Sequence, residues 1–154
     1  MASCTIFLGL TLDRTLSRKT HIDHLSSKLN TACYIIRYLK SAISTKNLRT
    51  IYFSYVHSII AYGIIFWGNL YHSKNIFKLQ KRAIRIIMNV DNSVSCHELF
   101  KKLNILPLHS QYILSLLLLF VVKNIEEFMS NFEVHFFNTR HKSDLYPQLT
   151  KYKK

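Results

Sequence analysis

Carboxylates come first, because clustered Asp and Glu side chains hold the two metal ions with which polymerases, nucleases and phosphatases work. The aspartates of this chain are scattered along the sequence: Asp13, Asp23, Asp91 and Asp144. Glu126 and Glu127 are neighbours, but adjacent residues of a helix point in different directions and cannot easily share a metal. The sequence therefore predicts no catalytic residues, and a chain that is not an enzyme on its own.

The densest group of possible metal ligands is His21 with His24, which share one face of a helix at a spacing of three. A zinc site needs two further ligands, and Cys33 falls on the opposite side of the same helix, nine positions past His24. We therefore expect a solvated start of a helix here. Since the sequence has no glycine-rich phosphate loop, no G-x-S-x-G and no C-x-x-C, we expect neither a bound metal nor a cofactor.

Basic residues form the pattern with the most chemical content. At 100° per residue, Lys74, Lys78, Lys81 and Arg85 fall within an arc of about 60°. The segment from Lys74 to Arg85 has five positive charges and no acidic residue, so it lacks the mixed-sign pairs of an ordinary solvated helix face. Spaced cations on one face can neutralise successive phosphates without reading bases. The predicted nucleic-acid-binding residues are Lys74, Lys78, Lys81, Arg82 and Arg85.

The overall charge points to the same kind of partner. The chain has 21 Lys and Arg against 8 Asp and Glu, a net charge of +13. Such a surface attracts polyanions, either nucleic acid or an anionic membrane surface, although basic chains without a dedicated partner also exist. The cysteines are odd in number and widely spaced, and the first twelve residues lack the features of a signal peptide, so we expect an intracellular protein, nuclear or cytoplasmic.

Few turn signals interrupt the chain, which has 3 glycines and 2 prolines, so long helices are favoured over a many-stranded sheet. The run Cys4 to Asp13 is β-branched and aromatic, which predicts one strand whose pairing partner lies outside this chain.

Apolar and capping patterns predict five helices in the rest of the sequence. The first two run from 20 or 21 to about 41, and from 46 to 63 after a cap at Ser44 or Thr45. The other three run from 74 to about 90 after a cap at Ser73, from Ser95 to 102 with a Ser95–Glu98 capping box, and from 109 to 124.

Two apolar stretches could suggest a membrane. Ile51 to Trp67 carries no charge, but a span needs about 20 apolar residues, and this stretch is shorter and broken by Gly63. Ile113 to Val122 is apolar on nearly every side, yet its ten residues are too few to span a bilayer. We expect no membrane span, a buried Trp67, and a last helix buried between neighbouring helices.

Five short motifs occur in order over nearly the whole chain, from Phe7 to about Leu145: Phe7-Leu-Gly-Leu-Thr-Leu-Asp13 followed by Leu16-Ser17 and His21-Ile22, Tyr62-Gly-Ile-Ile-Phe-Trp-Gly68, Leu79-Gln-Lys-Arg-Ala-Ile-Arg85, Leu103-Asn-Ile-Leu-Pro-Leu108 and Phe137-Asn-Thr-Arg140. In this order they resemble the region that follows the catalytic palm in reverse transcriptases of non-LTR retrotransposons, especially the insect jockey-like group. Arg18 stands where that family usually has Trp, and Asn89 stands where Gly often follows the basic helix.

The resemblance implies that residues 1–16 correspond to the palm-to-thumb junction and residues 20–128 to a helical thumb that lies against template and primer. It also implies that the family's catalytic carboxylates precede this region, so that a palm domain would come from another chain. Residues 129–154 are expected to form a basic, partly disordered tail. We predict a mainly α-helical bundle with one short N-terminal strand.

Three classes of function stay open. The chain could bind nucleic-acid backbone, whether RNA, DNA or hybrid, as a truncated reverse-transcriptase-like fragment. It could instead be a non-functional transposon relic or a helical interaction module, or a small basic membrane-associated protein.

Overall fold

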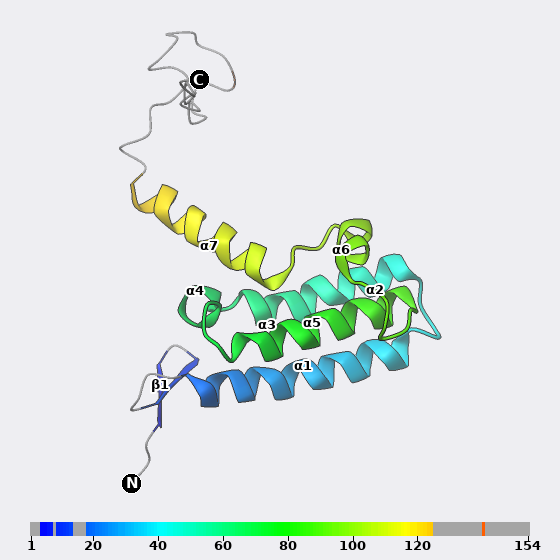
Figure 1. The fold of residues 1–154 in the computed structure, drawn as a ribbon, viewed down its shortest axis with the longest axis horizontal. Coiled ribbons are helices and arrows are strands. Elements are labelled where there is room, and N and C mark those ends of the chain that lie inside the picture. Colours follow the sequence, from blue (N-terminus) through cyan, green and yellow to red (C-terminus); the bar gives the residue numbers. More distant parts are fainter. Residues whose placement is uncertain (1–3, 8, 14–17, 125–139, 141–154) are drawn as a thin grey trace. The chain divides into compact units, whose positions relative to one another are not determined.

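The computed structural model describes residues 4–7, 9–13, 18–124 and 140. The fold is mainly α-helical with a small antiparallel sheet at the N-terminus, which confirms the predicted fold class (Figure 1). The elements follow in this order: β1 (Cys4–Phe7), β2 (Leu10–Asp13), α1 (Lys19–Leu39), α2 (Thr45–Ile51), the π-helix η1 (Tyr52–His57), α3 (Ser58–Ala61), α4 (Ile64–Trp67), α5 (Ser73–Met88), α6 (His97–Leu103) and α7 (Leu108–Lys123).

The N-terminal segment is a hairpin, so the prediction of one strand with a partner outside the chain was wrong. β1 and β2 pair antiparallel, with Cys4 opposite Asp13 and Phe7 opposite Leu10. The chain reverses at Gly9, whose φ of +74° is a left-handed value that glycine adopts without steric cost. Each strand thus supplies the other's hydrogen-bonding partner.

α1 buries five of the six apolar residues that recur in its sequence at steps of three and four: Ile22, Leu25, Leu29, Ala32 and Ile36. The sixth, Leu39, is half-buried, and Cys33 is buried beside the stripe. This stripe packs against α5, which lies alongside α1 (Figure 1). Asn30 of α1 is hydrogen-bonded to Arg82 of α5, and Lys40, ten residues later, is hydrogen-bonded to Asn89 at the end of α5. The residue numbers rise together in both pairs, so the two helices run in the same direction.

The predicted second helix, 46 to 63, is one helical path of three parts: α2, η1 and α3. Ser44 caps it as predicted, since its Oγ accepts a hydrogen bond from the Asn47 amide. Tyr52, Val56 and Ile60 are buried at intervals of four and hold the path against the core. The path ends at Tyr62, and Gly63 with φ +63° turns the chain into α4.

Trp67, at the end of α4, is fully buried as predicted. Its Nε1 donates a hydrogen bond of 3.1 Å to the carbonyl of Tyr62, which satisfies the indole N–H inside the core. The uncharged stretch that contains it is therefore core for much of its length, with Ile60 and Ile64 also buried.

Two helix starts differ from the predicted caps. α5 begins at Ser73 itself with His72 as its N-cap, and α6 begins at His97 with Cys96 as its N-cap, and neither N-cap residue gives a side-chain cap bond. The Glu98 carboxylate pairs with His97 and Lys101, whereas the expected capping box would pair it with the backbone at Ser95. Asn104 ends α6 with a left-handed φ of 50°.

The chain divides into two compact units, Met1–Ser115 and Leu116–Lys154, and α7 crosses the division. Leu108 and Gln111 are buried within the first unit. The expectation that the middle of α7 is buried was wrong for the described residues, because most of its apolar side chains are exposed: Ile113, Leu114, Leu117, Leu118, Leu119, Phe120 and Val122. Most of the expected tail lies outside the described residues, as do 125–128.

Within the described residues, no helix taken alone has the length and apolarity needed to cross a bilayer, whereas α6 and α7 together, bent by 55°, meet that criterion on length and composition.

Candidate nucleic-acid interface

The orientation of α5 is set by its buried side, which carries six residues packed into the bundle: Ser73, Ile76, Gln80, Ala83, Ile84 and Ile87. At 100° per residue the five predicted basic residues fall on the side opposite to these. Lys74, Lys78 and Arg82 are exposed, and Lys81 and Arg85 are half-buried. The structure therefore brings all five together along one outward side of a helix, which we call the basic stripe.

Two lysines of the basic stripe are steadied by aromatic rings. The Lys74 ammonium lies 4.7 Å from the centroid of the Tyr71 ring, and the Lys81 ammonium lies 4.7 Å from that of Phe77. A cation over a ring keeps its charge and restricts its side chain, so both ammonium groups stay available to an anion. Lys78, between them, is exposed.

The two arginines of the stripe have partners in the protein. Arg82 Nη1 donates to the side-chain oxygen of Asn30 on α1 at 3.4 Å, a long hydrogen bond. Arg85 donates from Nε and Nη2 to the carbonyl of Val94, at 3.1 and 2.9 Å. Arg85 therefore braces the loop between α5 and α6, and it contributes its positive charge to the stripe with fewer donors left for a ligand.

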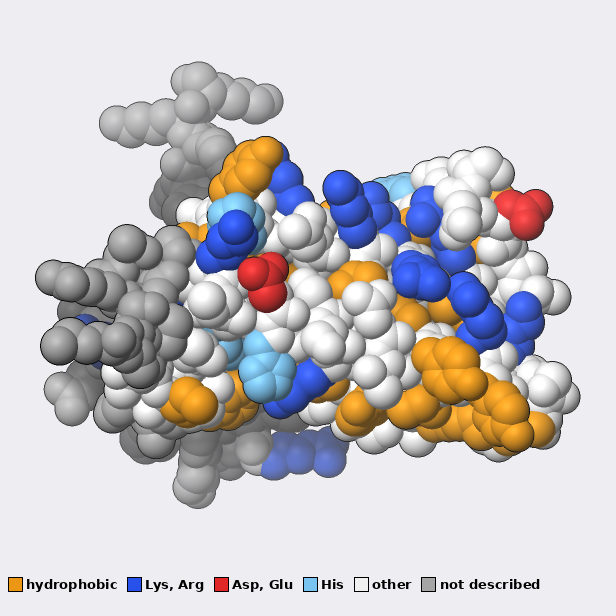
Figure 2. Space-filling model, turned by 90° about the horizontal axis from the view of Figure 1, so that it is seen from below, with side chains coloured by type: hydrophobic (Ala, Val, Ile, Leu, Met, Phe, Trp, Pro, Cys, Tyr) orange, Lys and Arg blue, Asp and Glu red, His pale blue; other side chains and the backbone are white. Residues whose placement is uncertain are grey.

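The cationic surface extends onto α1, beyond the residues that were predicted from the sequence. Burial raises the pKa of the Cys33 thiol, and the positive charges of Arg82 and Arg37 oppose that rise. At the end of α1, Lys40 Nζ donates to the side-chain oxygen of Asn89. Figure 2, which looks onto α1, shows Lys and Arg side chains gathered beside a group of hydrophobic side chains. Lys40 thus reaches across to the C-terminal end of α5, and the exposed Arg37 lies one turn before it on α1.

Among the described residues, no carboxylate forms an ion pair with a cation of the basic stripe. The acidic partner in the ion pairs found among the described residues is Glu98 of α6, which lies 3.3 Å from Lys101 and 3.9 Å from His97. The cations of α5 therefore have hydrogen-bond acceptors and aromatic rings as partners within the described part of the chain. An uncompensated row of this kind attracts a polyanion.

His21 is buried, so the expectation of a solvated helix start was wrong at this residue, although His24 is exposed. The Thr11 amide donates to His21 Nδ1 at 3.4 Å, which ties the hairpin to α1. Burial lowers the pKa of His21, and the nearby His24, Lys28 and Arg18 lower it further. A pocket of about 330 Å³ opens beside it, lined by Gly9, His21, His24, Leu25, Lys28, Ser58, Ile59 and Tyr62.

Metal ligands do not gather at this pocket or elsewhere in the described ranges, which hold no group of three or more His, Cys, Asp or Glu side chains placed to share an ion.

The two positions at which the chain departs from the retrotransposon pattern both have a left-handed backbone. Arg18 has φ 53° and stands with its guanidinium 5.7 Å from the Phe66 ring centroid. Asn89 has φ 55° and ends α5, where Gly or Asn is favoured. Asn at this position keeps the turn and adds the acceptor that Lys40 uses.

Comparison with protein-family models, with curated proteins and with solved structures gives no match to this chain.

Proposed function

We propose that this chain binds the sugar-phosphate backbone of nucleic acid, without reading its sequence, through the basic stripe of α5. The observation that carries the proposal is the set of five cations on one outward side of a helix, none of them in an ion pair among the described residues. Phosphates spaced along a strand are the polyanion that such a row fits.

Phosphate contact, as opposed to base reading, follows from the kind of side chain available. Lys74, Lys78 and Lys81 carry compact ammonium groups on flexible stems, which act as point charges toward phosphate. Base reading uses bidentate donors held in one geometry, and Arg85 spends two of its donors on the Val94 carbonyl. Binding should therefore vary little with sequence.

The motif order that resembles the thumb of non-LTR retrotransposon reverse transcriptases supports the same proposal. On that basis these residues are a reverse-transcriptase-like thumb that binds backbone, and a polymerase reaction needs a palm domain, whose catalytic carboxylates these 154 residues do not contain. The scattered aspartates agree with a binding role, because two-metal catalysis needs clustered carboxylates.

Fluorescence anisotropy with labelled RNA and DNA oligonucleotides of unrelated sequence tests the proposal. Affinities should agree between sequences, and the logarithm of the association constant should fall linearly with the logarithm of salt concentration, with a slope of magnitude about 3 to 5 for the five cations. An absence of binding at low salt would contradict the proposal and favour the interaction-module alternative.

A further inference from the structure

Two of the most exposed aromatic side chains lie on α1, close to the cationic surface. Tyr34 is 71% exposed and Tyr38 is 76% exposed. They are four residues apart, so both project from one face of the helix and are separated by about 6 Å along its axis. Within the described residues neither ring has an aromatic or cationic partner.

Tyr71 differs from this pair, because its ring is also 76% exposed but contacts other side chains. It carries the Lys74 ammonium at 4.7 Å and meets the His72 ring edge to face at 5.5 Å. Tyr34 and Tyr38 present their ring surfaces to solvent without such contacts, at the cost of leaving apolar area in water.

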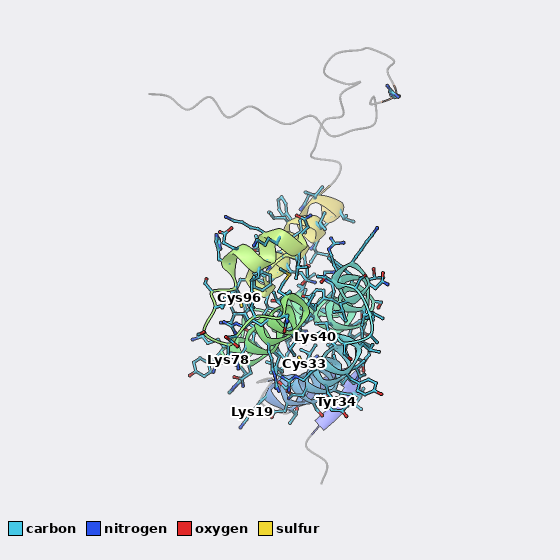
Figure 3. The ribbon with its side chains drawn as sticks, turned by 90° about the vertical axis from the view of Figure 1, so that its right-hand side faces the viewer. Lys19, Cys33, Tyr34, Lys40, Lys78 and Cys96 are labelled. Atoms are coloured by element: carbon cyan, nitrogen blue, oxygen red, sulfur yellow. The ribbon has the colours of Figure 1, made fainter. Side chains whose placement is uncertain are left out.

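The cations nearest to this pair lie on the α5 side of α1. Arg37 directly precedes Tyr38 and is one turn from Tyr34, and Asn30, one turn before Tyr34, holds Arg82 of α5. Seen along the helices, Lys78 of α5 and Tyr34 of α1 are labelled at opposite sides of the lower part of the molecule (Figure 3). Arg82 of α5, held by Asn30, and Arg37 of α1 therefore both lie within about one helical turn of Tyr34 along α1.

We propose that Tyr34 and Tyr38 form a stacking platform for unpaired bases, so that the preferred ligand is single-stranded nucleic acid. The inference rests on the proposed function, because the cations of α5 and Arg37 would hold the strand by its backbone. Bases of the same strand then stack on the two rings. Stacking is tolerant of sequence, since every base has a π face, and a duplex offers no free base faces except at its ends.

The test compares an oligo-thymidylate single strand with a blunt mixed-sequence duplex of the same length, each labelled with fluorescein. Replacing both tyrosines, Tyr34→Ala with Tyr38→Ala, should weaken single-strand binding by about 5- to 150-fold per tyrosine. Duplex affinity should change by less than about twofold. The salt slope should stay at its original value, because no charge is removed.

Two further variants make the result specific. Tyr34→Phe with Tyr38→Phe keeps both rings and should retain single-strand affinity, whereas Tyr55→Ala, at an exposed tyrosine of η1, should leave both ligands bound as before. Circular dichroism confirms that the helices are intact in each variant.

The outcomes separate this inference from the function on which it rests. Equal losses for single strand and duplex, or no loss for either, would overturn the stacking platform while backbone binding stands. Loss in the Phe variant as well would also overturn it and indicate a role of the hydroxyl groups. If the unmodified chain binds neither ligand at low salt, the proposed function fails and the platform with it.

Discussion

The side-chain amide of Gln80, on α5, donates a hydrogen bond of 2.9 Å to the hydroxyl of Tyr52, on η1, and both residues are fully buried. The same Nε2 donates to the Leu106 carbonyl at 3.0 Å, and Oε1 accepts from the Leu108 amide at 2.9 Å. Burial raises the pKa of Tyr52 to about 12, and the bond to Gln80 opposes that rise. We call these three hydrogen bonds of Gln80 the Gln80 clasp. They fix the rotation of α5 about its axis, and thereby keep the basic stripe facing outward.

Gln80→Leu should lower the free energy of unfolding by at least about 2 kcal/mol, because the Leu106 carbonyl and the Leu108 amide lose their partner inside the core. Tyr52→Phe removes one hydroxyl and should cost about 1 kcal/mol. Urea denaturation followed by circular dichroism measures both. A cost of Gln80→Leu below that of Tyr52→Phe would show that the Gln80 clasp does not hold α5.

Trp67→Ala should lower the free energy of unfolding by about 3–5 kcal/mol, because it empties a site filled by a fully buried indole and removes the bond to the Tyr62 carbonyl. Thermal or urea unfolding gives the value, and Trp67→Phe, which fills most of the volume, serves as the comparison. A loss of less than about 1 kcal/mol in the alanine variant would mean that the indole is exposed in solution.

Stability should decline in mild acid because of His21. Its folded pKa is below the unfolded value of 6.5, so the unfolded chain binds the proton more readily. Stability is therefore complete above that value and is lost as the pH falls through it toward the folded pKa. Burial also lowers the pKa of His57, which acts in the same direction.

Denaturation midpoints of the unmodified chain and of His21→Asn, measured at about pH 7.5 and about pH 5, isolate the contribution of His21. The loss between the two pH values should be smaller in the variant, which cannot titrate at this position. An identical loss in both proteins would assign the pH dependence to other groups.

Much of the helical framework could be predicted because the apolar residues of α1 and α5 recur at helical spacing over many residues. The side of α5 that faces outward followed from the same periodicity, since Ile76, Ala83 and Ile87 mark the buried side and Lys78 lies opposite. Such information is local, and a single sequence contains it.

Contacts between elements distant in the sequence could not be predicted, because local residue patterns do not encode them. Gly9 sits inside an apolar run, so the reversal at φ +74° looks like the interior of one strand. Composition shows that α7 is apolar but not whether a neighbour covers Leu117. The hydrogen bonds from Arg85 to the Val94 carbonyl and from Lys40 to Asn89 depend on which loops and helices pack together. No pattern along the chain carries those contacts.

The most direct test of the proposed interface is the salt dependence of oligonucleotide binding in two matched triple variants. One replaces Lys74, Lys78 and Lys81 with Gln, and the other replaces the exposed Lys28, Lys46 and Lys102 with Gln, so that both lose the same charge and neither alters Arg85. Gln has nearly the helix propensity of Lys. If α5 lies along the backbone, the slope of log affinity against log salt should shrink by about two to three units in the first variant and change little in the second. Equal changes in both would mean that binding reflects overall charge, and would contradict a site on α5.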